Sequence, residues 1–186
     1  MPRLNILYKQ TALALCLAGN AVVLYAQNEK PEAYQVKAIY LFNFTQFVEW
    51  PPAAFQDDDA PLIIGVLGED PLGTFLEEVI DGEQVHGRAL SIRRYEPEEE
   101  VREGHVLFIN LTDTDQIVRA LERLKGRRIL TVSDHDGFLE AGGMIQFISA
   151  NNDLQFQINP EAASAADLKI SSKLLRVAEV ITLPNE

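Results

Sequence analysis

Apolar residues in the middle of the chain fall into short runs that alternate with amphipathic segments. Four runs have the length of strands: Leu62–Leu67, Ala89–Tyr95, His105–Ile109 and Ile129–Val132. Two segments between them, Leu72–Ile80 and Asp113–Leu124, repeat apolar residues at steps of three and four, which indicates helices. Continuous apolar strands that alternate with helices predict a mainly parallel sheet that is covered on both faces.

The pattern changes toward the C-terminus. Met144–Ser149 and Leu154–Ile158 each have the character of a strand, and the polar residues between them favour a hairpin turn. Two helices are expected to follow, Pro160–Ala166 and Ser172–Ile181, the second with its apolar residues turned inward. Together these elements predict an α/β fold, a three-layer α/β/α sandwich whose mainly parallel sheet has an antiparallel hairpin near the C-terminus.

The first element of this fold is expected to be a helix from Pro31 to Glu49. Proline suits the first turn of a helix, and the residue before Pro51 disfavours its continuation. Side chains at three- and four-residue steps form an apolar stripe: Val36, Ile39, Tyr40, Phe44, Phe47 and Val48. Leu41 and Phe42 widen this stripe, so the helix is either buried in the domain's own core or shared with a partner. Leu41 and Phe42 are therefore candidate residues of a homodimer interface.

Residues 1–26 have the pattern of a secretory signal peptide. Arg3 and Lys9 provide a positive start, and an apolar stretch that ends at Ala26 follows. The stretch is shorter than the roughly 20 residues that a membrane-spanning helix needs. We expect cleavage near Ala26, with an uncleaved anchor as the main alternative and a lipoprotein signal at Cys16 as another.

The mature chain, residues 27–186, is long enough for one exported domain with its own core. The whole sequence has 28 acidic and 16 basic side chains, a formal net charge of −12 at pH 7. Such a surface repels phosphate backbones, which disfavours nucleic acid as a partner. The single cysteine, Cys16, leaves with the signal peptide, so the mature chain is expected to form no disulfide.

Polar residues that follow the expected parallel strands are candidates for a ligand site, because open α/β sheets bind ligands beyond the carboxyl ends of their strands. The candidates are Gly68, Asp70, Asn110, Ser133 and Asp134. The segment from Gly65 to Gly73 lacks the glycine spacing of a dinucleotide site and the Lys-Ser/Thr pair of a phosphate-binding loop. It is either an ordinary strand-to-helix turn or the cradle of a small ligand.

The run from Ser133 to Asp136 holds the residue types of a hydrolase triad. Residues this close in sequence seldom align for catalysis, because a triad is assembled from separate loops. The run is interpreted as a structural turn, with ligand contact as the first alternative and catalysis as the last. His86, His105 and His135 lack the spacing of zinc ligands. The residues therefore predict neither an enzyme nor a bound metal or other cofactor.

A series of short segments in one order gives the chain a resemblance to a known family. These segments are Ala33–Tyr40, Phe47–Pro51, Gly65–Gly68, Asp70-Pro71, Gly87-Arg88, His105–Ile109, Leu130–Asp134, Gly142–Ile145, Phe156–Asn159 and Leu168–Leu175. With them the sequence resembles the YfiR-like periplasmic proteins over nearly all of residues 34–178. One departure is Gly104, where the family often has a cysteine, so control through disulfides is not expected here.

The resemblance implies a periplasmic regulatory protein without enzymatic activity. The characterised type binds the periplasmic sensor portion of an inner-membrane diguanylate cyclase and represses it, which lowers cyclic di-GMP and biofilm formation. The expected partners are therefore the periplasmic domain of an inner-membrane signalling protein and a second copy of the chain. Because related domains occur in sensor kinases, the alternative is a periplasmic sensor domain that binds a small-molecule ligand and acts with such a kinase.

Overall fold

A computed structural model describes residues 31–97, 99–150 and 153–182. The expected signal peptide, residues 1–26, lies outside these described residues. Within them, no helix combines the length and the apolar character needed to cross a bilayer.

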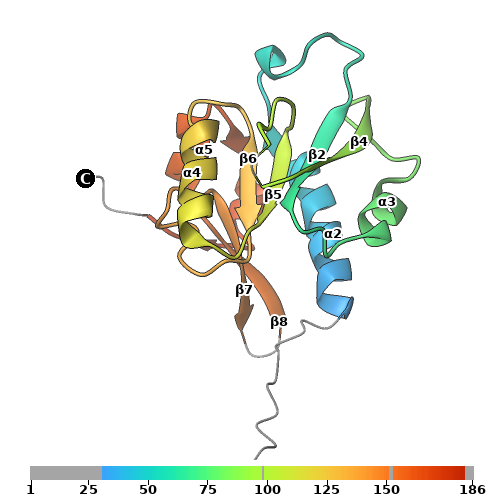
Figure 1. Cartoon of the computed structure of the whole chain (residues 1–186). Helices are drawn as coiled ribbons and strands as arrows, with labels where there is room; N and C mark the ends of the chain where they lie inside the picture. The colour runs from blue at the N-terminus through green and yellow to red at the C-terminus, as the bar shows by residue number, and fades with distance from the viewer. Residues whose placement is uncertain (1–30, 98, 151–152, 183–186) are drawn as a thin grey trace, which may run out of the picture.

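The centre of the fold is an eight-stranded sheet in the order β10-β8-β7-β6-β5-β2-β4-β3 (Figure 1). Five neighbouring strands are parallel: β7 (Ile145–Ala150), β6 (Leu130–Ser133), β5 (Val106–Asn110), β2 (Leu62–Gly68) and β4 (Arg88–Tyr95). β2, β5 and β6 are buried on both faces, which explains why each is a continuous apolar run.

The edges of the sheet are antiparallel or short. β8 (Asp153–Ile158) pairs with β7 as the expected antiparallel hairpin. The outermost strands have two residues each, β3 (Gln84–Val85) and β10 (Glu179–Val180). A separate two-stranded sheet joins β1 (Val48–Glu49) to β9 (Lys169–Ile170). The outermost strands therefore present little backbone for pairing with another chain.

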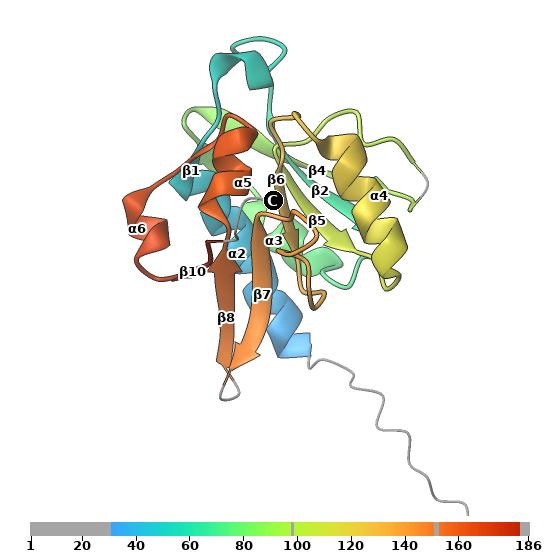
Figure 2. The ribbon, with the colours of Figure 1, turned by 90° about the vertical axis from the view of Figure 1, so that its left-hand side faces the viewer.

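Helices cover both faces of the sheet, which confirms the three-layer prediction. α2 (Pro31–Phe47), α3 (Thr74–Ile80), α5 (Pro160–Ala165) and α6 (Ser172–Leu175) contribute to one core, together with the 64, 66, 106 and 108 side chains of β2 and β5. α4 (Thr114–Leu124) packs on the other face against positions 67, 107 and 109. Figures 1 and 2 show α4 on the opposite side of the sheet from α2.

The prediction of one helix over Ser172–Ile181 is wrong in its second half. The helix ends at Leu175, and β10 then pairs in parallel with β8. The Ile181 nitrogen donates a hydrogen bond of 2.8 Å to the Ile158 carbonyl. Val177, which was expected to face inward, is 72% exposed. β-Branched residues favour the extended backbone, and the free edge of β8 supplies the hydrogen-bond partners that a helix would otherwise provide.

The buried side of α2 also differs from the expectation. Leu41 is completely buried, so its assignment to a homodimer interface is wrong. The residues that α2 buries are Lys37, Ala38, Leu41, Phe44 and Thr45. Val36 and Ile39 are instead 39% and 46% exposed. The buried face includes two polar positions, which a search for an apolar stripe passes over.

Candidate functional site

The five predicted ligand residues lie at the carboxyl edge of the sheet, where β2, β5 and β6 end. Gly68 pairs with Asn110 in the register of β2 and β5. Ser133 at the end of β6 donates a hydrogen bond of 2.7 Å to the Ile109 carbonyl of β5. The topology therefore brings three of the candidates together, as the sequence predicted.

Asp70, the fourth candidate, is occupied within its own turn. Its Oδ1 accepts hydrogen bonds from the nitrogens of Leu72 (2.9 Å) and Gly73 (3.1 Å), and its Oδ2 accepts one of 2.6 Å from Arg94. Hydrogen bonds to Glu77 and Asp70 raise the pKa of the Arg94 guanidinium. The carboxylate therefore stabilises the turn before α3.

Gly68 and Asn110 are likewise explained by the local fold. Asn110 Nδ2 donates a hydrogen bond of 2.9 Å to the Glu69 carbonyl. Gly68 has a φ of +93°, and a Cβ there would lie 2.3 Å from the Asn110 carbonyl oxygen. Only glycine accommodates both the backbone conformation and the close approach. The segment fits an ordinary strand-to-helix turn better than a ligand cradle.

Ser133 and His135 form a structural turn. Ser133 is completely buried, and its Oγ accepts a hydrogen bond of 3.2 Å from the His135 nitrogen while donating to Ile109. The His135 ring contacts the Asp136 carbonyl at 2.6 Å through Nδ1. The hydroxyl is thus bonded to the backbone, and it lacks the access to solvent that a nucleophile requires.

Asp134, the last candidate, binds a lysine. Lys37 of α2 donates a hydrogen bond of 2.6 Å to Asp134 Oδ2, and the Lys37 side chain has no exposure while that of Asp134 is 23% exposed. The Lys37 nitrogen also lies 4.7 Å from the centre of the Tyr34 ring. This pair ties the first half of α2 to the end of β6. The sequence signal for this pair is a lysine among the apolar residues of the first helix, and it was not predicted.

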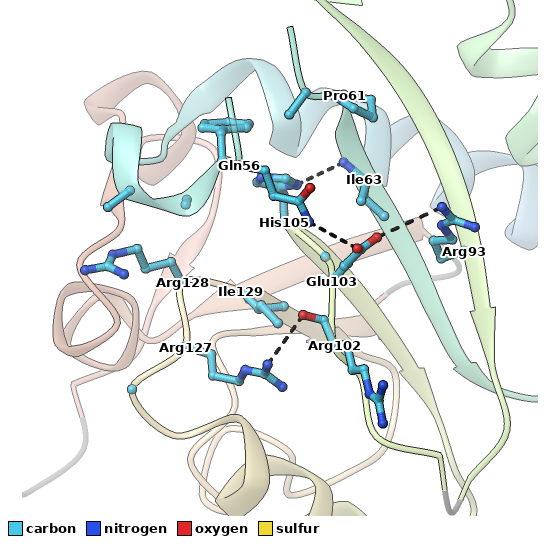
Figure 3. Close-up of a pocket in the computed structure, with 16 residues that line it drawn as sticks. Gln56, Pro61, Ile63, Arg93, Arg102, Glu103, His105, Arg127, Arg128 and Ile129 are labelled. Carbon is cyan, nitrogen blue, oxygen red and sulfur yellow. Dashed lines mark hydrogen bonds and ion pairs between the residues drawn. The ribbon is translucent and has the colours of Figure 1, made fainter. Parts of the chain in front are cut away.

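The opposite edge, where the same strands begin, contains a cavity of about 540 Å³ (Figure 3). We call it the amino-edge cavity. Its walls are the loops that precede β2, β5 and β6, and its apolar surface includes Phe55, Pro61, Ile63 and Ile129. None of the five predicted ligand residues lines it.

Four arginines line the amino-edge cavity: Arg93, Arg102, Arg127 and Arg128. Figure 3 shows them around His105, Ile63 and Ile129. Glu103 is the acidic residue of the lining, 4.0 Å from Arg93 and 3.2 Å from Gln56 Nε2. Three of the arginines precede a strand by a few positions. Parallel strands start at one edge, so arginines that precede strands are a sequence signal for this cavity, which was not predicted.

His105 lies at the base of the amino-edge cavity and is 4% exposed. Its Nδ1 accepts a hydrogen bond of 3.0 Å from the Ile63 nitrogen, so the neutral ring carries its proton on Nε2. Among the described residues, Nε2 has no hydrogen-bond partner. Burial lowers the pKa of His105 to about 4, while the Ala54 carbonyl opposes this shift and the charge of Arg88 adds to it. His105 is therefore a buried neutral ring, and the Ala54 carbonyl is a poorly aligned acceptor for it rather than a regular hydrogen-bond partner.

Phe55 covers His105 and is held in place by Arg88. The Phe55 and His105 rings stack with centroids 4.4 Å apart, and the Arg88 guanidinium lies 3.8 Å from the Phe55 centroid. Arg88 also donates to the carbonyls of Asp57 (3.0 Å) and Ala60 (2.7 Å). One arginine from β4 thus anchors the loop that walls the cavity.

Trp50 contributes a second buried donor near this loop. Its Nε1 has no partner within the described part of the chain, and its ring centroid lies 6.0 Å from that of His105. A second cavity, of about 430 Å³, is lined by Trp50, Phe55 and Arg88. Phe55 lines both cavities and therefore forms part of the wall between them.

No group of three or more His, Cys, Asp or Glu side chains in the described ranges is arranged to hold a metal ion. His86 lies in the turn between β3 and β4 with a φ of +53°, whereas His105 precedes β5 and His135 follows β6.

Residues 34–179 match the model of the YfiR/HmsC-like family. The chain belongs to this family. A comparison with curated proteins finds no match. The region shared with the YfiR/HmsC-like family contains the residues of the carboxyl edge, those of the amino-edge cavity and nearly all of α2.

The surface of this YfiR/HmsC-like chain also has exposed apolar side chains on α2. Val36 and Ile39 lie one helical turn apart and are partly open to solvent. Phe42, predicted as an interface residue, is half-buried and packs against the core at the border of this exposed face. The apolar surface of α2 is therefore centred on Val36 and Ile39 rather than on Leu41.

Proposed function

We propose that this protein is a periplasmic regulator that binds the periplasmic part of an inner-membrane signalling protein. The partner in this proposal is a diguanylate cyclase, whose repression lowers cyclic di-GMP and biofilm formation. Membership of the YfiR/HmsC-like family carries the proposal. The function is binding without catalysis, and the burial of Ser133 supports that part of it.

Export places the protein where this function needs it. Residues 1–26 have a positive start and a short apolar stretch, and their removal leaves Gln27 as the first residue. Mass spectrometry of the periplasmic fraction is expected to find this N-terminus. Protein that begins at Met1 in that fraction would contradict cleavage.

The proposed contact surface is the exposed face of α2, with Val36 and Ile39 at its centre and Phe42 at its border. Exposed apolar side chains in an acidic protein suit a partner that covers them. Each contributes roughly 1.5–3 kcal/mol when it is fully buried. The same face serves the expected homodimer in this proposal.

Cells that lack the gene are expected to contain more cyclic di-GMP, and the wild-type gene is expected to restore the lower level. Ile39→Asp should fail to restore it, because a charge on the contact face opposes burial. Val118→Asp is the matched control, since Val118 is 36% exposed on α4 in the opposite layer. Equal restoration by both variants would place the contact elsewhere, and an unchanged cyclic di-GMP level in the deletion strain would contradict repression of a cyclase.

A second candidate function is a small-ligand sensor that acts with a sensor kinase. The amino-edge cavity favours it, because about 540 Å³ is within the size range of small-molecule sites, roughly 300–1,000 Å³. A shift of the unfolding temperature by a small metabolite would support this candidate over a purely protein-binding role.

A further inference from the structure

The distribution of positive charge singles out the amino-edge cavity. The chain has a net charge of −12, yet four arginines line this one cavity together with one carboxylate, that of Glu103. The side chains of Arg93, Arg102 and Arg128 are 60%, 80% and 40% exposed. Guanidinium groups that share a cavity repel one another, and a bound anion removes this cost.

Two of these arginines have donors to spare. Arg102 Nε faces Glu100 at 3.5 Å and Arg128 Nε faces Asp167 at 3.3 Å, while their terminal nitrogens make no hydrogen bond within the described residues. Exposed ion pairs of this kind contribute little stability, so an anion can compete with them. Arg127 differs, because it donates to the carbonyls of Val101 and Arg102 and supports the loop.

The remainder of the cavity is suited to an apolar group. Phe55, Ile63 and Ile129 form part of its surface, and the neutral ring of the buried His105 also belongs to the lining. The chemistry that fits is an anionic head attached to an apolar body.

We propose that the amino-edge cavity is a binding site for a small organic anion. Arg102 and Arg128, whose exposed side chains lie on opposite sides of the cavity in Figure 3, turn toward its phosphate or carboxylate head, and the apolar body packs against Ile63, Ile129 and Phe55. The chain as a whole is acidic and repels a polyanion, so the ligand is small. This site does not depend on the regulatory function proposed above, and it lies at the opposite edge from the predicted ligand residues.

Phenyl phosphate is a suitable probe because it combines a divalent head with one ring. The emission of Trp50, the single tryptophan, reports on binding because its ring lies 6.0 Å from His105. Amide chemical shifts of Gly104, Gly126 and Ile129 give a second, local readout. We expect saturable binding to the purified protein, and Arg102→Gln and Arg128→Gln should each weaken it about tenfold, the loss of a charge-assisted hydrogen bond.

Arg119→Gln is the matched control, because it removes the same charge from the exposed face of α4, away from the cavity. It should leave the affinity within about twofold of the wild type, the range left by screened charges at a distance. Thermal unfolding verifies that each variant is folded. An equal loss in all three variants would reduce the effect to net charge and overturn the site, as would the absence of saturable binding or shifts confined to other residues.

Three further compounds define the ligand class. Benzoate should compete with phenyl phosphate if the head is recognised as an anion, whereas benzyl alcohol should not. Inorganic phosphate should bind more weakly than phenyl phosphate, because it leaves the apolar surface uncovered. Equal binding of benzyl alcohol and phenyl phosphate would show that the arginines take no part, and the proposal would then be wrong.

Discussion

At the carboxyl edge of the sheet, Asp70, Asn110 and Asp134 each have a partner within the protein. At the amino edge, His105 and Trp50 each leave a buried nitrogen without one among the described residues. The first edge is tied down by α2 through Lys37, and the second opens into a cavity lined by arginines. The two ends of the same strands thus differ in how completely their polar groups are satisfied.

The difference teaches that topology alone does not locate a ligand site. Open α/β sheets bind ligands beyond the carboxyl ends of their strands, where loops diverge and leave a crevice. Here the Lys37–Asp134 pair closes part of that space with the protein's own charge. The cavity and the buried nitrogens without hydrogen bonds among the described residues lie at the amino edge instead, which is the end of the strands where a ligand site is not usually expected.

The largest effect is expected at the carboxyl edge, from a change that breaks the ion pair between Lys37 and Asp134. Asp134→Asn removes the carboxylate that neutralises the fully buried Lys37. Loss of one partner of a buried ion pair leaves the other charge less well compensated, so the free energy of unfolding should fall by about 3 kcal/mol. Urea denaturation followed by circular dichroism measures this change.

Lys37→Met is the matched variant, since it removes the buried charge and keeps a side chain of similar length. It should cost less than Asp134→Asn, because Asp134 is 23% exposed and can be solvated. A smaller loss for Asp134→Asn than for Lys37→Met would mean that the pair is not what closes this edge.

The second-largest effect is expected from His105, the buried histidine at the amino edge of the sheet. The folded pKa of His105 is about 4, below the ordinary value of 6.5. Below pH 6.5 His105 becomes protonated in the unfolded chain, whereas in the folded chain it stays neutral until the pH reaches about 4. His105 therefore stabilises the fold fully above pH 6.5, and this contribution, at most about 3 kcal/mol, is lost as the pH falls toward 4.

His105→Asn keeps an acceptor for the Ile63 nitrogen and removes the titrating group. The variant's unfolding free energy should depend less steeply on pH between about 6.5 and 4 than that of the wild type. Parallel curves for the two proteins would show that His105 is not buried in solution as it is in the structure.

The fold was largely predictable because strands that are buried on both faces must be apolar throughout. The runs at β2, β5 and β6 therefore identify the sheet without further information. Strands of two residues such as β1, β9 and β10 have no period to detect, and partners far away in the sequence decide their conformation.

The two edges were predictable to different degrees. The sequence placed Gly68, Asn110 and Ser133 together correctly, because parallel strands end at one edge. It did not reveal that their polar groups are internally bonded, since that depends on side chains such as Arg94 that approach from elsewhere. The arginine cavity escaped detection because its residues are separated in sequence and are gathered only by the strand order.

A smaller effect is expected from Phe55, which lines the amino-edge cavity. Phe55→Ala removes the ring that stacks on His105 and contacts Arg88. The loss of a half-buried aromatic contact should reduce the free energy of unfolding by about 1.5 kcal/mol. Water then reaches His105, so the pKa measured from its NMR shifts should rise from about 4 toward 6.5.

Phe75→Ala is a control for this change, because Phe75 is also half-buried but belongs to α3 and packs against the core that α2 covers. It should destabilise the protein without moving the His105 pKa. If Phe55→Ala also leaves that pKa unchanged, the aromatic ring does not shield the histidine.

The smallest effect is expected from Ser133 at the closed edge. Ser133→Ala removes the hydrogen bond to the Ile109 carbonyl and the acceptor for the His135 nitrogen. The net loss should be about 1 kcal/mol, as for a single neutral hydrogen bond. Ser164→Ala, a change at an exposed position of α5, should have less effect.

Because Ser133 is completely buried, a fluorophosphonate probe should not label the wild-type protein at this residue. Covalent labelling of Ser133 would show that the carboxyl edge opens to solvent and that its turn can act as a nucleophilic site, which would contradict the non-catalytic role.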